Sequence, residues 1–269
     1  MPRPERMLPW LAVLVAVAVA GCNRLSFVRP DTSRGNYTQV APEIEVSDRG
    51  RRSPLAVRDQ LLLAEQRLRA GQHDQARAHA EAALRLDPRS ADAHTMLALV
   101  AQRGGDQARA GGHYAKAAEL APQQGYALNN YGTWLCANGR AAEALPWFER
   151  ALASPGYGTP ADALANAGAC AARIGQDARA ERDLRRALQL DPANPVALAA
   201  IAGLALRQGR ALEARAFVER RLAATPADAE ALRLASQIEH KLGDRAAAER
   251  YTRQLRAEFG DAIPPQSGE

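Results

Sequence analysis

The chain has 269 residues, of which 47% are hydrophobic but only 5% aromatic, and its formal net charge is +5. An apolar interior built mainly from Ala and Leu suits closely packed helices better than sheets, so we expect an all-α fold. The positive charge is a mild excess spread over many Arg residues and lacks the dense basic cluster of a nucleic-acid-binding protein. We therefore expect no nucleic-acid partner, and an acidic protein segment or anionic lipid headgroups fit the charge better.

The N-terminus has the features of a bacterial secretion signal. Arg3 and Arg6 precede an apolar run at residues 8–20, which is shorter than the roughly 20 residues needed to span a bilayer. The run leads into Val-Ala-Gly-Cys, ending at Cys22, and this resembles the lipobox of bacterial lipoproteins, in which cleavage before the cysteine frees it for acylation. We expect residues 1–21 to be a lipoprotein signal peptide; the alternative is an ordinary apolar helix that happens to contain a cysteine.

Lipid on Cys22 would fix the protein to a membrane. Three acyl chains, at about 0.8 kcal/mol per buried methylene, make release negligible. In lipoproteins of this kind an aspartate after the cysteine tends to retain the protein at the inner membrane, whereas here Asn23 follows. The resemblance therefore implies the inner leaflet of the outer membrane, with the protein facing the periplasm.

Two segments have the composition of irregular chain. Residues 22–56 are rich in Arg, Ser, Asp, Pro and Gly and show no apolar period, so we expect a flexible tether after the lipidated cysteine. A disordered segment of about 30 residues has a root-mean-square reach of about 30 Å. The tail 259–269, with its Pro-Pro and Ser-Gly, is also expected to be disordered.

A repeated pattern begins at about Val57. One glycine marks each unit, with successive spacings of 34, 34, 36, 34 and 34 residues, and an alanine follows five residues after each glycine. The glycines are Gly71, Gly105, Gly139, Gly175, Gly209 and Gly243. This is the signature of tetratricopeptide repeats, and it predicts a right-handed superhelix of about six repeats over residues 57–258, each made of two antiparallel helices, A and B.

The residue types in this pattern have physical reasons. Glycine ends helix A in a turn that a β-carbon would strain, and proline, which lacks an N–H, stops helix B. Small residues in helix A are expected to let the two helices approach closely opposite a bulky residue of helix B, as for Gly132 with Phe148 and Gly168 with Leu184. In the sixth repeat Glu239 and Thr252 stand at usually apolar positions, so we expect this repeat to act as a solvating cap.

No catalytic arrangement is found, so we expect no enzyme activity and no cofactor. The five histidines form no H-E-x-x-H motif, and no serine lies in a nucleophile elbow. His79 and His113 occupy the same repeat position and are expected to be neighbours. Two surface histidines without a third ligand are seldom a metal site, so we expect no metal.

Cys136 and Cys170 lie 34 residues apart, in the A helices of adjacent repeats. An oxidising periplasm would permit a disulfide. The two-residue insertion between these repeats places Cys136 two positions further along its helix, and this offset favours an α-carbon separation beyond the roughly 7 Å limit. Two buried thiols are therefore the favoured prediction, with a disulfide as the alternative.

One position near the end of helix A is basic in five repeats. The residues are Arg69, Arg103, Arg173, Arg207 and Lys241, and Ala137 is the exception. Such a column is consistent with a positive ladder on the concave face that holds an acidic or extended peptide. Because each cation also lies where it complements the dipole of its own helix, the dipole is the favoured explanation.

The third repeat differs from the others in its aromatic and amide content. It is followed by an inserted loop, residues 153–160, that is rich in Pro and Gly. Aromatic and amide side chains in a groove suit peptide recognition as well as packing, and the two explanations stay open. The candidate protein-binding residues here are Tyr126, Asn129, Asn130, Thr133, Trp134, Tyr157 and Asn166.

This region also carries a more specific resemblance. The run from Tyr126 to Gly132, then Cys136 and Phe148, and the run 166–170 are similar to the type IV pilus biogenesis lipoproteins PilF and PilW. The resemblance implies a pilotin, a lipoprotein that binds subunits of the outer-membrane secretin and promotes their localisation and multimerisation. We expect a monomer with secretin subunits as partners.

Two other classes of function remain as alternatives. A generic periplasmic adaptor lipoprotein would use the same fold to recruit cell-wall or outer-membrane assembly factors. An enzyme would need a fused catalytic domain, and the repeats leave no segment for one. Loss of secretin multimers in the absence of this protein would separate the pilotin from the adaptor.

Overall fold

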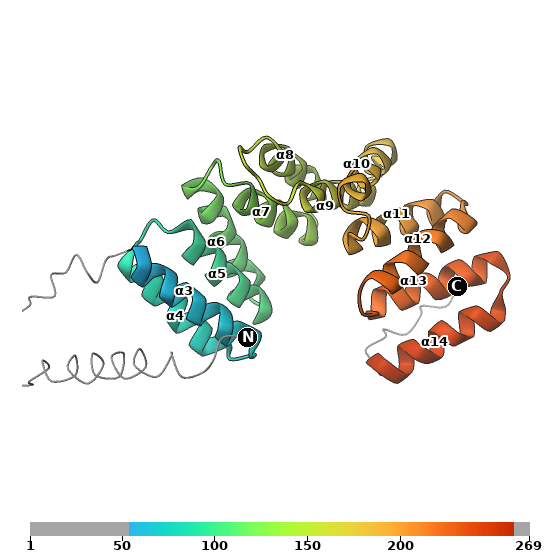
Figure 1. The fold of residues 1–269 in the computed structure, drawn as a ribbon, viewed down its shortest axis with the longest axis horizontal. Helices are drawn as coiled ribbons and strands as arrows, with labels where there is room; N and C mark the ends of the chain where they lie inside the picture. Colours follow the sequence, from blue (N-terminus) through green and yellow to red (C-terminus); the bar gives the residue numbers. More distant parts are fainter. Residues whose placement is uncertain (1–53, 261–269) are drawn as a thin grey trace, which may run out of the picture. The chain divides into compact units, whose positions relative to one another are not determined.

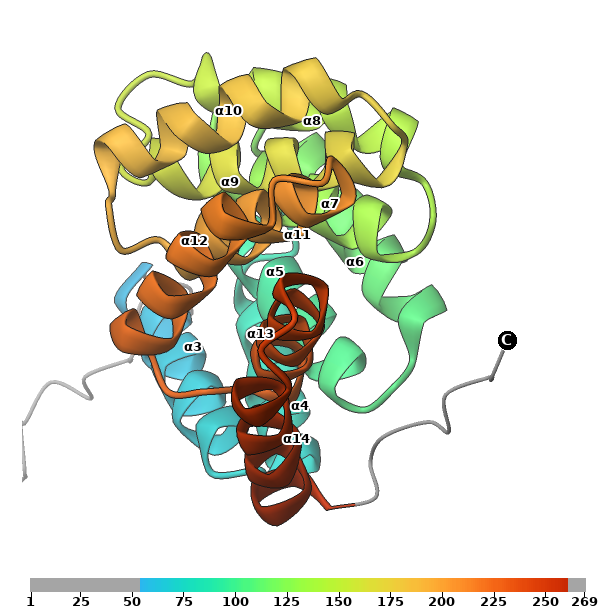
Figure 2. The same cartoon turned by 90° about the vertical axis from the view of Figure 1, so that its right-hand side faces the viewer.

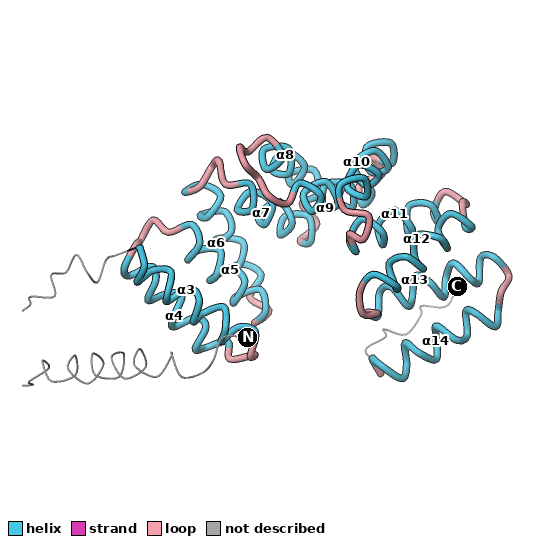
Figure 3. Tube along the Cα trace, viewed as in Figure 1, coloured by secondary structure: helices cyan, strands magenta, loops and turns pink. Residues whose placement is uncertain are grey.

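The computed structural model describes residues 54–260, and every regular element in that range is an α-helix (Figures 1 and 3). The helices are α3 (Pro54–Arg69), α4 (His73–Leu86), α5 (Ala91–Arg103), α6 (Gln107–Leu120), α7 (Gly125–Ala137), α8 (Ala141–Leu152), α9 (Pro160–Arg173), α10 (Asp177–Leu190), α11 (Pro195–Arg207), α12 (Ala211–Ala224), α13 (Ala229–Leu242) and α14 (Arg245–Phe259). These twelve form six antiparallel pairs, each an odd-numbered helix A followed by an even-numbered helix B. The predicted all-α array of six repeats is confirmed.

The first helix begins earlier than the repeat pattern suggests. It starts at Pro54, three residues before the predicted start of the repeats, because proline is well tolerated in the first turn, where its missing N–H would have no helical partner. The expected signal peptide, Cys22 and most of the tether lie outside the described residues, as does the tail from residue 261.

The pairs stack in chain order. Each B helix packs against its own A helix, and each one before α14 also packs against the A helix of the next pair; the A helices of consecutive pairs contact one another too (Figures 1 and 2). The A helices therefore stand closer together than the B helices and form the concave side of the stack. No helix of residues 54–260 combines the length and the apolar character that a membrane crossing needs.

Small residues bring the two helices of a pair into direct contact, as predicted. A β-carbon on Gly132 would lie 2.9 Å from Cε1 of Phe148, and one on Gly168 would lie 2.7 Å from Cγ of Leu184. Phe148 and Leu184 are fully buried. At the end of each A helix the marker glycine has a φ between +72° and +82°, a conformation that a β-carbon would strain.

The sixth repeat contradicts one expectation. Glu239 does not solvate the end of the stack but is buried, and its carboxylate accepts hydrogen bonds from Nε, at 2.9 Å, and Nη2 of Arg215 in α12. Thr252 bonds Ser236 Oγ at 3.0 Å. Glu239 thus joins the last two repeats, because a buried carboxylate is stable only when it is paired. Thr252 joins the two helices of the last repeat.

Two histidines join the helices of the second repeat. Nδ1 of His94 in α5 lies 3.0 Å from Nδ1 of His113 in α6, within hydrogen-bond distance. His79, expected beside His113, instead bonds Gln60 Oε1 at 2.8 Å. Within residues 54–260 no three side chains of His, Cys, Asp or Glu gather as metal ligands.

Burial lowers the pKa of both paired histidines below the ordinary value of 6.5. For His94 the charges of His113 and Lys116 lower the pKa further. For His113 the charge of Arg109 lowers the pKa, whereas Glu81 raises it. Protonating both rings would remove their hydrogen bond and bring two positive charges together.

This pair predicts a loss of stability in mild acid. Between the folded and the unfolded pKa the unfolded chain binds more protons, so the free energy of unfolding should be fully present above pH 6.5 and fall as the pH drops below it. Urea unfolding across this range should show a shallower slope for His94→Gln/His113→Gln. The exposed His240→Gln variant should keep the wild-type slope, and an unchanged slope in the double variant would contradict the assignment.

Adjacent glycines in α6 offer a matched test of packing. A β-carbon on Gly111 would lie 2.2 Å from Cζ2 of Trp134, whereas one on Gly112 meets nothing within 4 Å. Gly111→Ala should lower the free energy of unfolding by about 1–3 kcal/mol through overpacking, and Gly112→Ala should raise it by about 0.5–1 kcal/mol through helix propensity. Urea unfolding measures both; shifts of the same sign would show that Trp134 does not pack on Gly111.

Candidate protein-binding face

Two of the candidate amide residues, one in repeat three and one in repeat four, link two A helices. Nδ2 of Asn166 in α9 donates to Oδ1 of Asn129 in α7 at 3.1 Å, and Asn129 is buried. Asn130 is partly exposed and its side chain makes no hydrogen bond to any described residue, while Thr133 is exposed and bonds the Asn129 carbonyl at 2.9 Å. The structure therefore leaves Asn130 and Thr133, rather than Asn129, accessible to a partner.

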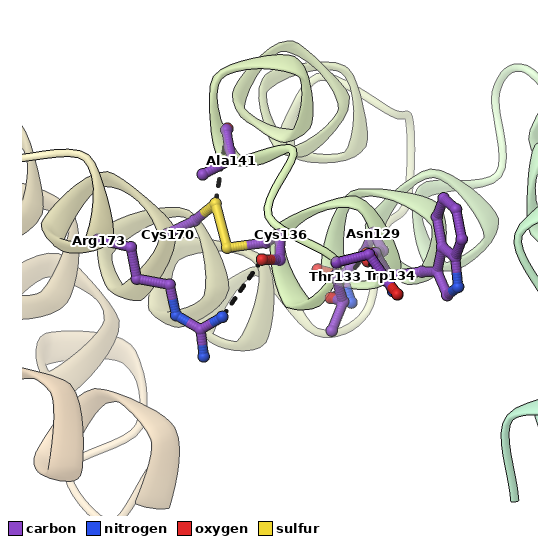
Figure 4. Close-up of a disulfide and its surroundings, with 8 residues drawn as sticks. Asn129, Thr133, Trp134, Cys136, Ala141, Cys170 and Arg173 are labelled. Atoms are coloured by element: carbon purple, nitrogen blue, oxygen red, sulfur yellow. Dashed lines mark hydrogen bonds between the residues drawn. A yellow bond between two sulfur atoms is a disulfide. The ribbon is translucent and has the colours of Figure 1, made fainter. Parts of the chain in front are cut away.

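Trp134 packs between repeats instead of lining a groove. Its indole lies over Gly111 of α6 and stacks on Tyr131, with ring centroids 6.1 Å apart. Figure 4 shows the side chain directed away from Cys136. Its Nε1 is buried and has no hydrogen-bond partner among residues 54–260. We assign Trp134 a packing role at the junction of repeats two and three.

The two candidate tyrosines are also engaged within the protein. Tyr157, in the inserted loop, lies against Gly125 at the start of α7, and burial raises its pKa. The Tyr126 hydroxyl donates to the Asp92 carboxylate and bonds Gln124 Oε1 at 2.6 Å. Burial and the Asp92 bond raise the pKa of Tyr126 well above its usual range. The inserted loop thus covers one end of α7 rather than opening the face.

The side chains of the basic column have different partners. Arg173 Nη1 donates to the Cys136 carbonyl at 3.2 Å, and Arg207 Nη2 to the Ala172 carbonyl at 3.5 Å. These carbonyls belong to the last turn of the preceding A helix, so each cation complements its neighbour's dipole, not only its own. Arg69 pairs with Glu65 on its own helix, and Arg103 is exposed.

A pocket opens on the concave side among α9, α11 and α13, with a volume of 590 Å³. Its lining includes Arg173 and Arg207 of the basic column. The repeat pattern did not indicate the other lining residues, which include Val196, Ala199, Ala200, Gly203, Arg233 and Leu234. Their signal was present in α11, whose residues 195–206 carry no polar side chain although a helix packed on one side needs only one apolar face.

Cys136 and Cys170 form a disulfide between α7 and α9, with their α-carbons 5.8 Å apart (Figure 4). The prediction of two buried thiols was therefore wrong. Cys136 follows Gly132 by four residues, and Cys170 follows the equivalent Gly168 by two. Two residues correspond to about 200° of helix rotation. Neighbouring parallel helices meet through opposite faces, so the offset turns the two sulfurs towards each other.

Removing this bridge should destabilise the protein. A crosslink between residues 34 apart stabilises by about 4 kcal/mol in the chain-entropy model. Dithiothreitol should lower the melting temperature of the wild type, and Cys136→Ala/Cys170→Ala should melt lower whether or not reductant is present. An equal effect of reductant on both proteins would show that it acts elsewhere.

Comparisons with known proteins agree with this architecture. Models of the tetratricopeptide repeat match residues 61–125 and 171–238. The type IV pilus assembly protein PilF of Pseudomonas aeruginosa is 27% identical over 199 residues, which is 74% of this chain and 79% of that protein.

Solved structures extend the similarity. The crystal structure of PilW, described as a widely conserved type IV pilus biogenesis factor, has 31% identity and a TM-score of 0.69, with 77% of this chain and 95% of PilW covered. A structure of Pseudomonas aeruginosa PilF has 26% identity and a TM-score of 0.65, with 76% and 92% covered. The chain belongs to the PilF/PilW family of tetratricopeptide-repeat proteins.

Proposed function

We propose that this protein acts in type IV pilus biogenesis as a pilotin, an outer-membrane lipoprotein that binds secretin subunits and promotes their localisation and multimerisation. The observation that carries the proposal is the similarity to PilW, which extends over 95% of that chain. PilF is described as a type IV pilus assembly protein. Tetratricopeptide repeats bind other proteins through surfaces formed by stacked helices.

The concave face is the proposed contact surface. Asn130 and Thr133 are accessible on α7, and Arg173 and Arg207 line the pocket on α9 and α11. The Asn129–Asn166 bond and the disulfide both hold α7 against α9. A face fixed in this way loses little conformational freedom when a partner binds, which favours affinity.

The lipid anchor on Cys22 supplies the other half of the proposed mechanism. Its support is the lipobox resemblance of the sequence that ends at Cys22. A binder held at the inner leaflet of the outer membrane confines its client there and raises the client's effective concentration, so multimers assemble without a chemical step.

Deleting the gene tests the proposal through heat-resistant secretin multimers of outer-membrane fractions, separated on a denaturing gel. We expect the multimers to vanish and to return with the wild-type gene. A Cys22→Ala protein that stays periplasmic should restore assembly but not the outer-membrane position, because binding remains while the anchor is lost.

The opposite result would favour a different client. If multimers persist unchanged at the outer membrane of the deletion strain, the pilotin proposal fails, and the protein is better described as a periplasmic adaptor. Restoration by the wild-type gene controls for effects on neighbouring genes.

A further inference from the structure

The pocket among α9, α11 and α13 holds an unbalanced positive charge. Its lining includes four guanidinium groups and two carboxylates, a net charge of +2. Arg221 and Asp228 pair with each other, which neutralises that pair and ties the turn before α13 to α12. Glu230 is the remaining carboxylate of the lining, and it is exposed.

Three arginines keep their charges available. Arg173 and Arg207 donate to backbone carbonyls, which are neutral. Arg233, on α13, makes no hydrogen bond or ion pair with any described residue and is only partly exposed. Elsewhere on the same face Arg69 is neutralised by Glu65. Three such arginines therefore lie in the last three repeats, while the second repeat contributes one exposed cation of the column, Arg103.

Between these arginines the pocket has an apolar wall. Helix α11 presents Val196, Ala199, Ala200 and Gly203 to it, at the three- and four-residue spacing of a single helix face. Val196 is 42% exposed. A β-carbon on Gly203 would meet only Arg207 Nη1, at 3.9 Å. The wall is thus built from small side chains, which let an incoming backbone approach α11 closely.

We propose that this pocket binds an extended, acidic segment of a partner protein, whose carboxylates pair with Arg173, Arg207 and Arg233 and whose short apolar side chains lie on α11. The proposal rests on the proposed function in one respect, that the concave face binds protein. Guanidinium groups favour carboxylates because they form two parallel hydrogen bonds with them. The apolar wall distinguishes such a segment from a small inorganic anion, which would leave α11 uncovered.

The test uses the full chain and a defined probe. The probe is a fluorescein-labelled decapeptide in which Asp alternates with Val, and its control replaces each Asp with Asn. Fluorescence anisotropy should show binding of the acidic peptide that weakens as salt rises, with the neutral peptide binding at least about tenfold more weakly. Equal binding of the two peptides, or no binding of either, would overturn the proposal.

Two variants locate the site without disturbing the fold. Arg233→Glu reverses a charge that makes no internal bond, and Gly203→Leu fills the pocket while it raises helix propensity. Each should lower the affinity for the acidic peptide about tenfold. The matched controls are Arg250→Glu on α14 and Gly112→Leu on α6, both outside the pocket, which should bind as the wild type does.

The chain's own acidic tail is the competing occupant. A chain ending at Gly260 should bind the peptide with the affinity of the full chain, and markedly tighter binding would show that residues 261–269 occupy the pocket instead. The anisotropy measurement involves no secretin, so its failure leaves the pilotin proposal standing. If the multimer assay contradicts the pilotin proposal, the peptide-binding measurement still tests whether the pocket binds an acidic segment.

Discussion

Direct contact between the two helices of each repeat is the constraint on which the rest of the structure depends. Gly132 and Gly168 leave space that Phe148 and Leu184 fill completely. Interiors packed at this density transmit a change of one methyl group to the surrounding residues. Each B helix before the last also packs on the next A helix. The distance between the two helices of one pair therefore sets the position of the next pair, and so the curvature of the concave face.

Small side chains also shape the candidate binding pocket. Helix α11 presents mainly Ala and Gly to the pocket, and its Ala202 and Ala205 pack in one cluster with Val218 of α12. A smooth wall gives little specificity by itself. Specificity must come from charge, and the guanidinium groups of Arg173 and Arg207 supply it while their bonds to the preceding helix fix their positions.

Repeats three and four are joined by covalent and hydrogen bonds as well as by helix packing. The disulfide and the Asn129–Asn166 bond both join α7 to α9, at the place where the insertion breaks the 34-residue period. Tyr157 of the inserted loop packs against Gly125 and covers the exposed end of α7. The irregular junction between repeats three and four is therefore held by a disulfide and a side-chain hydrogen bond in addition to helix packing. These two links fix α7 against α9 on the concave face.

The sequence by itself determined the all-α class, the six repeats and the pairing of small with bulky residues, because these depend on the period of the chain and on contacts inside one repeat. It also aligned Arg173 and Arg207 in one column near the ends of the A helices, for which the helix dipole was the favoured explanation. Only the tertiary structure decided the disulfide, the buried pairing of Glu239 with Arg215, and the role of Arg233 in the pocket. Those features depend on how far one helix is rotated towards its neighbour, and a linear pattern does not specify that rotation.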